Sequence, residues 1–386
     1  MSRIDDLIAE YCPDGVKHQT LGEIGEFIRG NGIQKRDFQD SGFGCIHYGQ
    51  IYTYYGLFAD HTKSFIDPNL AEKRKKAYKG DLVIATTSEN EEDVCKACAW
   101  LGEEPIAISG DAYIFRHHQN PKYISYCFQS ELFQSQKKKY ITGTKVLRVN
   151  GDAMAKIHVP VPPLPVQEEI ARILDSFSSL EAELEAELEA RRKQYTHYRD
   201  ELLKFERVLI ASLGELCKIS VGRKNGTAGE FGEYPYVNAG TSMSGFVNEW
   251  SEEGDCVTTP SRGQGGMGFV AYQASRFWCG PLCYVMRSKH SDVMIKYVYY
   301  YLCSHKADIL GLVHEGGTPA INKSELAGLR ILVPPFEEQQ RIVSILDRFD
   351  KLTNDLSSGL PAEIEARHKQ YEYYRDRLLS FDELAA

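Results

Sequence analysis

Hydrophobic side chains recur at alternating spacings of four and three residues along two stretches of the chain, residues 166–206 and 336–386. This heptad spacing predicts two helices, each with one apolar stripe along its length. The first stretch also contains a run of Glu, Ala and Leu, a strongly helix-forming composition. The expected seam positions are Ile170, Leu174, Phe177, Leu184, Leu188 and Tyr195 in the first helix and Ile342, Leu346, Phe349, Leu356, Leu360 and Tyr371 in the second.

Both helices are expected to be long, because about 40 residues span roughly 60 Å at the α-helical rise. Glu181 and Arg191 interrupt the seam of the first helix. The second helix carries additional residues near Gly359 and Pro361, and we expect a kink or break there, since proline disrupts a helical turn. Two seams of equal length would most simply pair with each other. The alternative is that each packs against its own neighbouring domain.

The chain contains the same sequence pattern twice. Residues 189–205 and 365–381 are identical at twelve of seventeen positions, and residues 161–177 resemble residues 333–349. The repeated unit is therefore about 180–190 residues, far longer than a solenoid repeat. We predict four segments, namely a globular domain at 1–165, a helix at 166–206, a second globular domain at 207–335 and a second helix at 336–386.

The two globular segments have the pattern of mixed α/β domains, so the predicted fold class is α+β. Short β-branched or aromatic runs alternate with turns rich in Gly, Asn and Asp. Strands are expected at residues 81–85, 112–116 and 282–287, and helices are expected to begin near residues 123–128 and 295–302.

The net charge of −9 is concentrated in the two predicted helices, and the rest of the chain sums to zero. The globular segments can therefore carry local basic patches, which are candidates for contact with nucleic acid. Such patches are Lys73–Lys76, Lys137–Lys139, and Arg29 together with Lys35 and Arg36.

The ten cysteines are scattered over 386 residues, as expected for reduced thiols and not for a disulfide framework. Two pairs of cysteines are close in sequence, Cys95 with Cys98 and Cys279 with Cys283. The two pairs are far from each other in the chain and neither has a His at ligand spacing, so we expect no metal site. The sequence has no apolar run of about 18 residues and no signal-peptide pattern, and we expect a soluble, cytoplasmic protein.

No catalytic motif is present in the sequence. We find no phosphate-binding G-x-x-x-x-G-K-[ST] loop, no G-x-G-x-x-G that opens a βαβ unit, no G-x-S-x-G and no H-E-x-x-H. The Asn/Asp-Pro-Pro-aromatic signature of amino-methyltransferases is also absent. We therefore expect a non-catalytic chain without a cofactor of its own.

Both globular segments instead contain polar, glycine-punctuated loops suited to reading nucleic acid. Cations in such loops can contact phosphates, and amide and hydroxyl groups can read base edges. The candidates in the first segment are Arg29, Asn31, Gln34, Lys35, Arg36, Tyr48, Gln50, Tyr52, Thr86, Thr87, Ser88, Asn90 and Lys145. Those in the second are Arg223, Lys224, Asn225, Asn238, Ser261, Arg262, Gln264 and Thr318.

Over its whole length the chain resembles the specificity subunits of Type I restriction–modification systems. The resemblance is carried by the start from Ile4 to Val16, by the Leu-Gly-Glu openings of both domains and by the two V-P-P…I-L-D-x-F segments. The most specific part is Gly359–Arg367 followed by Lys369–Arg375. The first helix departs from this pattern because it is shorter and lacks the Gly-Leu-Pro element.

The resemblance implies that each globular domain reads one half of a bipartite site on double-stranded DNA. The two helices would lie antiparallel as a coiled coil, set the spacing of the half-sites with pseudo-twofold symmetry, and dock two methyltransferase subunits through the seam region. The resulting complex would be an adenine-N6 methyltransferase, and further motor subunits would make it a nuclease. S-adenosylmethionine, and ATP with Mg²⁺ for restriction, are expected in those partner subunits.

Three other interpretations remain open at this point. A tandem-domain coiled-coil adaptor could bind protein or carbohydrate through the same loops, and it would show no salt-dependent affinity for DNA. An enzyme with a dispersed active site would turn over substrate without partners. A specificity subunit could also serve methylation alone, without a nuclease.

Overall fold

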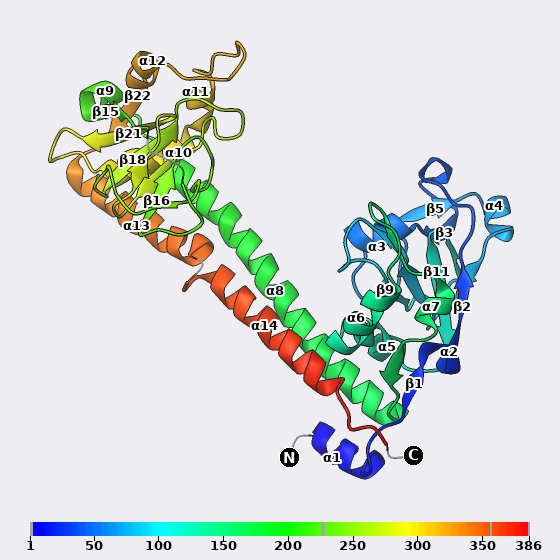
Figure 1. The fold of residues 1–386 in the computed structure, drawn as a ribbon. Coiled ribbons are helices and arrows are strands. Elements are labelled where there is room, and N and C mark those ends of the chain that lie inside the picture. Colours follow the sequence, from blue (N-terminus) through cyan, green and yellow to red (C-terminus); the bar gives the residue numbers. More distant parts are fainter. Residues whose placement is uncertain (1–2, 225–227, 356, 385–386) are drawn as a thin grey trace. The chain divides into compact units, whose positions relative to one another are not determined.

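The computed structural model describes residues 3–224, 228–355 and 357–384. The chain divides into two compact units, of which the first is Met1–Glu183 with Glu365–Ala386 and the second is Leu184–Ile364. Each unit is a mixed α/β domain together with part of the long helices (Figure 1). Among the described residues, no helix has the length and apolarity needed to cross a membrane.

Two sheets form the centre of the first unit. A five-stranded sheet has the order β2-β11-β7-β9-β4, and a four-stranded sheet has the order β5-β3-β10-β6. Two short ribbons, β1-β13 and β12-β8, lie at the ends of these strands. The strands are β1 (His18–Thr20), β2 (Gly25–Arg29), β3 (Phe43–Ile46), β4 (Phe58–Ala59), β5 (Ser64–Ile66), β6 (Lys76–Ala77), β7 (Leu82–Ala85), β8 (Thr87–Ser88), β9 (Lys96–Trp100), β10 (Ile106–Ile108), β11 (Ala112–His117), β12 (Leu147–Arg148) and β13 (His158–Pro160).

Short helices surround these sheets. α5 packs on β9 through aromatic side chains, because Tyr123, Tyr126 and Phe128 are almost completely buried in the main core. The helices are α1 (Arg3–Tyr11), α2 (Leu21–Ile24), α3 (Tyr48–Thr53), α4 (Pro68–Glu72), α5 (Pro121–Cys127), α6 (Glu131–Lys137) and α7 (Gly151–Met154), with 3-10 turns η1 (Lys35–Asp37) and η2 (Lys138–Tyr140).

The second unit has the same plan with fewer strands. Its sheets have the orders β15-β21-β18-β19 and β17-β16-β20, and β14 pairs with β22. The strands are β14 (Leu209–Ser212), β15 (Cys217–Val221), β16 (Tyr234–Val237), β17 (Phe246–Val247), β18 (Cys256–Pro260), β19 (Ala271–Gln273), β20 (Trp278–Cys279), β21 (Cys283–Ser288) and β22 (Arg330–Val333). The short helices are α9 (Leu213–Leu216), α10 (Ile295–Ser304), α11 (Lys306–Leu310) and α12 (Lys323–Ala327).

The duplication extends to close backbone packing. A Cβ atom added to Gly22 would lie 3.1 Å from the Cβ of Ala155, and one added to Gly214 would lie 3.0 Å from the Cβ of Ala327. Each glycine belongs to the one-turn helix that follows the first strand of its unit, α2 or α9. The glycine of each Leu-Gly-Glu opening is therefore explained by the approach of a second helical turn, α7 or α12.

Three long helices carry the heptad pattern: α8 (Leu164–Leu202), α13 (Phe336–Asn354) and α14 (Leu360–Leu378). The predicted break in the second helical segment is confirmed, because α13 ends at Asn354 and α14 begins at Leu360. Gly359 is required at this break, since a Cβ there would lie 2.6 Å from the carbonyl oxygen of Lys351 and 2.8 Å from that of Asp355. Leu356, a predicted seam residue, lies outside the described residues.

The outer parts of the seam pack on the neighbouring domain as well as on the other helix. Ile170 and Leu174 are fully buried in the core that contains α5, and Ile342 and Leu346 are fully buried in the core that contains α10. Both interpretations of the seam therefore apply at these positions. The expectation that the heptad stripe packs only on the other helix is therefore incomplete, because the same stripe also packs on the domain core.

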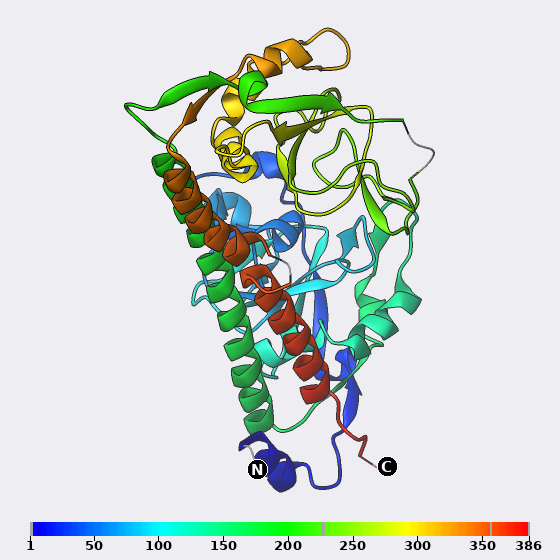
Figure 2. The same cartoon turned by 90° about the vertical axis from the view of Figure 1, so that its left-hand side faces the viewer.

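Within each unit the long helices also contact each other (Figure 2). In the first unit, Phe177 stacks on Tyr374 with ring centroids 5.5 Å apart, and Glu181 accepts a 2.7 Å hydrogen bond from His368. As the residue number rises along α8, the number of its partner on α14 falls, so the two helices are antiparallel. In the second unit, Phe349 lies 6.4 Å from the ring of Tyr195.

The remaining seam positions differ in burial. Leu360 and Tyr371 are buried, whereas Leu184 and Leu188 are half-buried. The interruption by Glu181 is explained by its partner, since His368 supplies a polar contact at that level. The strands predicted at 81–85, 112–116 and 282–287 and the helices predicted near 123–128 and 295–302 are confirmed as β7, β11, β21, α5 and α10.

Candidate nucleic-acid interface

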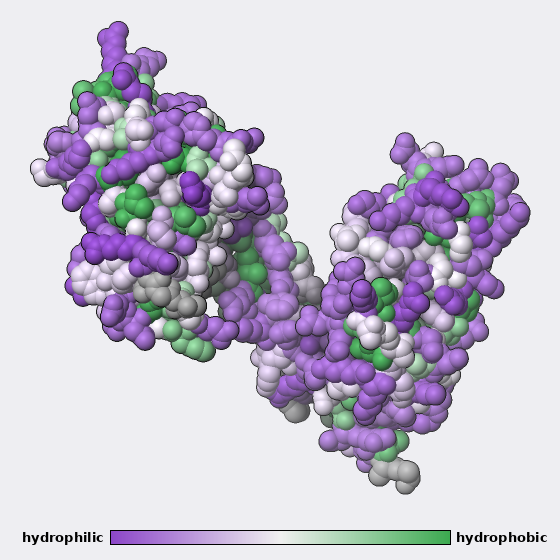
Figure 3. Space-filling view, turned by 45° about the horizontal axis from the view of Figure 1, so that its top comes forward, coloured by the Kyte–Doolittle hydropathy of each residue, from purple (hydrophilic) through white to green (hydrophobic). Residues whose placement is uncertain are grey.

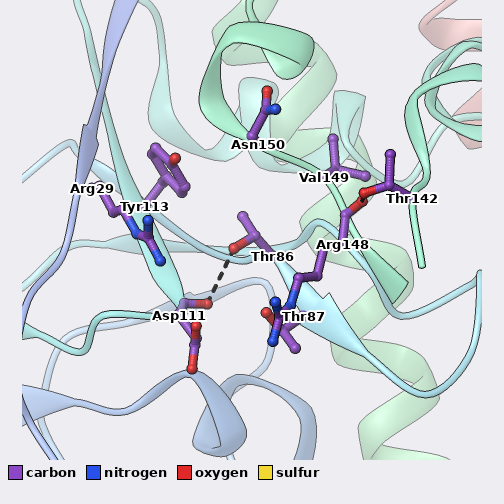
Figure 4. Close-up of a pocket in the computed structure, with 9 residues that line it drawn as sticks. All are labelled: Arg29, Thr86, Thr87, Asp111, Tyr113, Thr142, Arg148, Val149 and Asn150. Atoms are coloured by element: carbon purple, nitrogen blue, oxygen red, sulfur yellow. Dashed lines mark hydrogen bonds between the residues drawn. The ribbon is translucent and has the colours of Figure 1, made fainter. Parts of the chain in front are cut away.

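A polar hollow of about 420 Å³ opens on the first unit beside the ends of β2, β8, β11 and β12 (Figure 4). Its walls mix cationic, anionic, hydroxyl and amide groups, as a surface that recognises base edges needs. It is lined by Arg29, Thr86, Thr87, Asp111, Tyr113, Thr142, Arg148, Val149 and Asn150. The sequence predicted Arg29, Thr86 and Thr87, and the structure brings these three together.

Strand geometry positions this hollow. Arg29 ends β2 directly opposite Tyr113 of β11, and its Nε donates a 3.1 Å hydrogen bond to the carbonyl oxygen of Gly110. The buried Thr86 donates from its hydroxyl to the carbonyl oxygen of Asp111 at 3.3 Å. Thr86 therefore supports the wall, while the exposed Arg29 lies at the opening.

Arg148 is a second cation at the hollow, and the sequence pattern did not indicate it, Asp111 or Tyr113. Arg148 lies opposite Thr142 across a tight turn, where each residue's N–H donates to the other's carbonyl at 2.9 and 2.8 Å. Gly143 has a φ of +99°, so glycine is favoured in that turn. Gly143 followed by Val146-Leu147-Arg148 could have indicated this short strand.

Several predicted base readers use their side chains within the protein. Asn31 donates to the carbonyl oxygen of Lys73 at 3.2 Å and accepts from the backbone N–H of Lys75 at 2.8 Å. Gln50 donates to the Ser64 hydroxyl at 2.7 Å and accepts from the N–H of His47 at 3.0 Å. These amides hold loops in place, so any part they have in binding is through loop shape.

Other predicted residues are held in the same way. Tyr52 donates a 2.8 Å hydrogen bond to the carbonyl oxygen of Thr87, and burial raises the pKa of its hydroxyl, which therefore stays protonated. Asn90 exchanges hydrogen bonds with Asp93, and Ser88 accepts one from the N–H of Asn90. Tyr48 is half-buried and packs on the β3–β10 side of the unit.

The exposed cations of the first unit gather where two turns meet. Lys35 and Arg36 lie in η1, and the bonds from Asn31 join that loop to the basic turn Lys73–Lys76. A Cβ on Gly32 would lie 2.8 Å from a terminal guanidinium nitrogen of Arg74, which shows how closely the two turns approach. Gln34 and Lys145 are also exposed. The Lys73–Lys76 patch and the Arg29–Arg36 patch are therefore parts of one surface.

The second unit presents its predicted residues on corresponding loops. Arg223 follows β15, where its N–H donates to the carbonyl oxygen of Cys279 at 2.7 Å, as the N–H of Asn31 donates to that of Ile108. Asn238 has a supporting role, since its side-chain oxygen accepts from the N–H of Leu282 at 2.9 Å. Exposed side chains are Arg223, Lys224, Arg262, Gln264 and Thr318, and Ser261 is half-exposed, while Asn225 lies outside the described residues.

A hollow of about 280 Å³ adjoins these loops and includes Asn238, Gly240 and Thr241 in its lining. Among the described residues, no three His, Cys, Asp or Glu side chains are grouped so as to hold a metal ion. On the face seen in Figure 3, hydrophilic side chains cover most of each unit, and the apolar patches between them are small.

Comparison with known proteins gives a family. The chain matches the family described as Type I restriction modification DNA specificity domain twice, over residues 13–190 and 208–366. It is 35% identical over 273 residues to the Type I restriction enzyme EcoR124I/EcoR124II specificity subunit of Escherichia coli. That match covers 60% of this chain and 65% of the E. coli subunit, so the chain spans just under two thirds of that relative.

A second relative and two solved structures agree. The putative type I specificity subunit S.MpnORF615P of Mycoplasma pneumoniae is 33% identical over 244 residues, which are 59% of this chain and 94% of that one. The S subunit of a Type I restriction–modification system from M. genitalium has a similar fold, with a TM-score of 0.63 and 15% identity over 94% of this chain and 96% of that chain.

A similar fold is found in a chain from a structural study of complex assembly and conformational transition of the type I R-M system. It has a TM-score of 0.58 and is 16% identical, and the match covers 95% of this chain and 98% of that chain. The twofold match to the family covers most of the sequence, and each matched segment contains one α/β domain with the helix that follows it. The chain therefore belongs to the type I restriction modification DNA specificity family.

Proposed function

We propose that this chain is the subunit that selects the DNA sequence for a type I restriction–modification complex, with each unit binding one half of a bipartite site. The observation that carries the proposal is a contrast between the two units. Their buried frameworks share a set of equivalent hydrogen bonds, whereas the exposed residues on the corresponding loops differ.

The shared framework is a set of buried hydrogen bonds. Gln167 in the first unit donates to the carbonyl oxygen of Pro162, and Gln339 in the second donates to that of Pro334. Both glutamines are almost completely buried. In addition, Gln339 accepts from the N–H of Met294, as Gln167 accepts from a backbone N–H of its own unit.

A second element of the framework ties each long helix to its domain. Asp175 on α8 accepts from Lys122 at 2.6 Å and from the hydroxyl of Tyr126 at 2.7 Å. Asp347 on α13 is bonded in the same way, to a lysine and a tyrosine of α10. Equivalent hydrogen bonds beneath loops of different sequence allow a protein to hold two different binding surfaces in the same orientation on their helices.

The loops differ in residue type at equivalent places. Asn31 corresponds to Arg223 and Thr86 to Ser261, because their backbone hydrogen bonds match. Two units with unlike loops favour two unlike half-sites, and the exposed cations favour contacts to phosphate. We assign residues 1–165 and 207–335 to the two recognition domains and residues 166–206 and 336–386 to the helical spacers.

We further propose that the long helices dock two methyltransferase subunits. The repeated segments 189–205 and 365–381 cover the C-terminal parts of α8 and α14 and the three residues after each helix, and repeated surfaces suit two copies of one partner. The chain would supply no catalytic group. S-adenosylmethionine, and ATP with Mg²⁺ where restriction occurs, would bind in the partners, and the complex would act in the cytoplasm, where it meets DNA.

The test is co-expression of the chain with type I methyltransferase subunits from its own genome, followed by purification and sequencing of the host DNA for N6-methyladenine. We expect a complex, and methylation at a bipartite motif that disappears when the chain is omitted. A matched measurement is the salt dependence of DNA binding, which should weaken as Lys35 and Arg36 are both replaced by alanine.

Absence of a complex together with salt-independent DNA binding would contradict the proposal and would favour an adaptor for protein or carbohydrate. Methylation of an identical motif without the chain would also contradict it. A complex that methylates DNA but never cleaves it would retain the DNA-selecting function and remove the nuclease from the proposal.

A further inference from the structure

Each unit contains the same two-residue cross-strand pair at the edge of its candidate interface. In the first unit, Thr87 of β8 lies opposite Arg148 of β12 in an antiparallel pairing. In the second unit, Arg262 lies opposite Ala320, also antiparallel. Both pairs continue into a tight loop, since Arg148 pairs with Thr142 and Ala320 pairs with His314.

Backbone hydrogen bonds establish that the two pairs are equivalent. The residue after Arg148, Val149, donates to the carbonyl oxygen of Thr86 at 3.2 Å. The residue after Ala320, Ile321, donates to that of Ser261 at 2.9 Å. Thr87 therefore corresponds to Arg262, and Arg148 corresponds to Ala320.

The arginine therefore lies on opposite strands of the equivalent pairs, because Arg148 is on the second strand in the first unit and Arg262 is on the first strand in the second unit. Paired residues of an antiparallel ribbon point to the same face with Cβ atoms about 5 Å apart. An arginine on either strand of the pair can therefore bring its guanidinium to the same region. Each pair carries one arginine and one small residue, Thr87 or Ala320, which leaves room for it.

These guanidinium groups are free to bind a ligand. Arg148 and Arg262 are exposed, and among the described residues neither guanidinium has an ion-pair or hydrogen-bond partner. Arg29, by contrast, is held by the hydrogen bond that its Nε donates to the carbonyl oxygen of Gly110. In Figure 4 the guanidinium of Arg148 lies beside Thr87.

The surroundings of Arg148 favour a base over a phosphate. Asp111 lies in the same hollow, and its carboxylate would repel a phosphate. A G·C pair presents two acceptors on guanine, O6 and N7, which suit a bidentate arginine, and one donor on cytosine, which suits a carboxylate. In the second unit the residue equivalent to Asp111 is Leu282, because Thr86 and Ser261 donate from their N–H to the carbonyl oxygens of Asp111 and Leu282.

We propose that Arg148 and Arg262 each read a guanine in their own half-site, from equivalent positions of the same ribbon. The proposal rests on the DNA-selecting function proposed above and adds which side chains and which base carry the selection. It also implies that the first unit discriminates its G·C pair more strongly than the second, since only Asp111 adds an acceptor.

The experiment uses the whole chain in complex with its methyltransferase, and it reads the methylated motif for each variant. Arg148→Ala should relax one guanine position in one half of the motif and leave the other half unchanged, and Arg262→Ala should do the converse. Replacing that guanine by 7-deazaguanine, which lacks N7, should weaken binding of the original complex about 10-fold and leave the Arg148→Ala complex unaffected. The matched comparison is Lys145→Ala, an exposed cation on the same loop, which should weaken binding to all sequences equally and keep the motif.

A variant with the cation moved across the ribbon, Thr87→Arg with Arg148→Ala, should recover the guanine preference. The proposal is overturned if Arg148→Ala keeps a strict motif and weakens binding equally on all sequences, because that is the behaviour of a phosphate contact. It is also overturned if neither half-motif contains guanine. A complex whose motif never depended on this chain would instead overturn the proposed function, so the two failures are distinct.

Discussion

At the scale of single residues, polar side chains in the candidate interface divide into supports and exposed groups. Asn31, Gln50 and Asn238 hold backbone groups of neighbouring loops, whereas Arg36, Lys145 and Arg262 extend into solvent. A supporting amide affects binding by fixing where its neighbours lie, and an exposed cation affects it by direct contact. Substitution at the two kinds of position should therefore have different signatures.

Asn31→Ala removes two hydrogen bonds that join the loop before η1 to the turn Lys73–Lys76. We expect the free energy of unfolding to fall by about 1–2 kcal/mol, at roughly 1 kcal/mol for each bond. DNA affinity should fall on all sequences, and the methylated motif should stay the same. Urea unfolding and motif sequencing measure both, with Lys35→Ala as the control that lowers affinity without lowering stability. A relaxed motif would show that Asn31 reads a base directly.

His117 should give the first unit a dependence on pH. Its side chain is buried, and burial lowers the pKa of the imidazole from 6.5 to about 4. Nδ1 accepts from the N–H of Gln119 at 3.1 Å, and Nε2 has no hydrogen-bond partner among the described residues. The fold therefore favours the neutral ring, and only the unfolded chain binds the proton between pH 6.5 and 4.

The sign follows from that difference. The stabilising contribution is complete above pH 6.5 and is lost as the pH falls toward 4, by about 3 kcal/mol at most. We expect His117→Gln to remove this part of the loss. Unfolding followed by Trp100 fluorescence, in a Trp250→Phe/Trp278→Phe background, isolates the first unit, and the exposed His61→Gln is the control. Equal acid sensitivity of His117→Gln and the parent would contradict the assignment.

Residue types in loops could be predicted only in part. The glycine-rich spacing pointed to Arg29, Thr86 and Thr87 as loop residues, and the structure places all three at one hollow. Arg148 and Asp111 were missed, since their approach depends on pairing between β8 and β12, which are about sixty residues apart in the chain. The sequence pattern predicts which residues lie in turns, but it does not predict which distant strands pair.

At the scale of elements, the break between α13 and α14 is held by specific hydrogen bonds and by close backbone packing at Gly359. Asp355 accepts hydrogen bonds from both the N–H and the hydroxyl of Ser357, and these bonds lower the pKa of its carboxyl group. The N–H of Gly359 donates to the carbonyl oxygen of Asp355 at 3.0 Å. The chain thus turns within a few residues and resumes as a helix.

Gly359→Ala should destabilise the second unit, because the added methyl group would lie under 3 Å from three backbone carbonyl oxygens. We expect a loss of about 1–3 kcal/mol in the free energy of unfolding. Trp250 and Trp278 report on this unit in a Trp100→Phe background. Gly316→Ala, in the same unit and with nothing within 4 Å of the added Cβ, is the control. An unchanged stability would show that the break relaxes without cost.

Helices were the most predictable elements, and the reason is physical. A sustained heptad pattern over about forty residues has few alternative interpretations, and Gly359 with Pro361 two residues later marks a break. The packing partner of the seam was less predictable. Ile170 and Ile342 show why, since the same apolar stripe serves the domain core and the neighbouring helix.

At the scale of the whole molecule, duplication is the organising feature. Both units keep the capping box, the glycine–alanine contact and the Gln, Asp, Lys and Tyr framework, and both match the same family. Buried contacts that the two units share, together with loops that differ between them, favour a protein that offers two different surfaces to one kind of ligand. The repeat was visible in the sequence, and the equivalence of individual loop residues became clear from the matched backbone hydrogen bonds.

The most direct test of this account is an exchange of one recognition domain. Residues 18–160, from β1 to β13, would be replaced by the corresponding segment of another family member whose motif is known, and the methylated motif of the complex would be sequenced. The account predicts that one half of the motif changes to that of the donor, while the other half and the spacing stay the same. A motif that is unchanged, or one that changes in both halves, would contradict the central claim that each unit reads its own half-site.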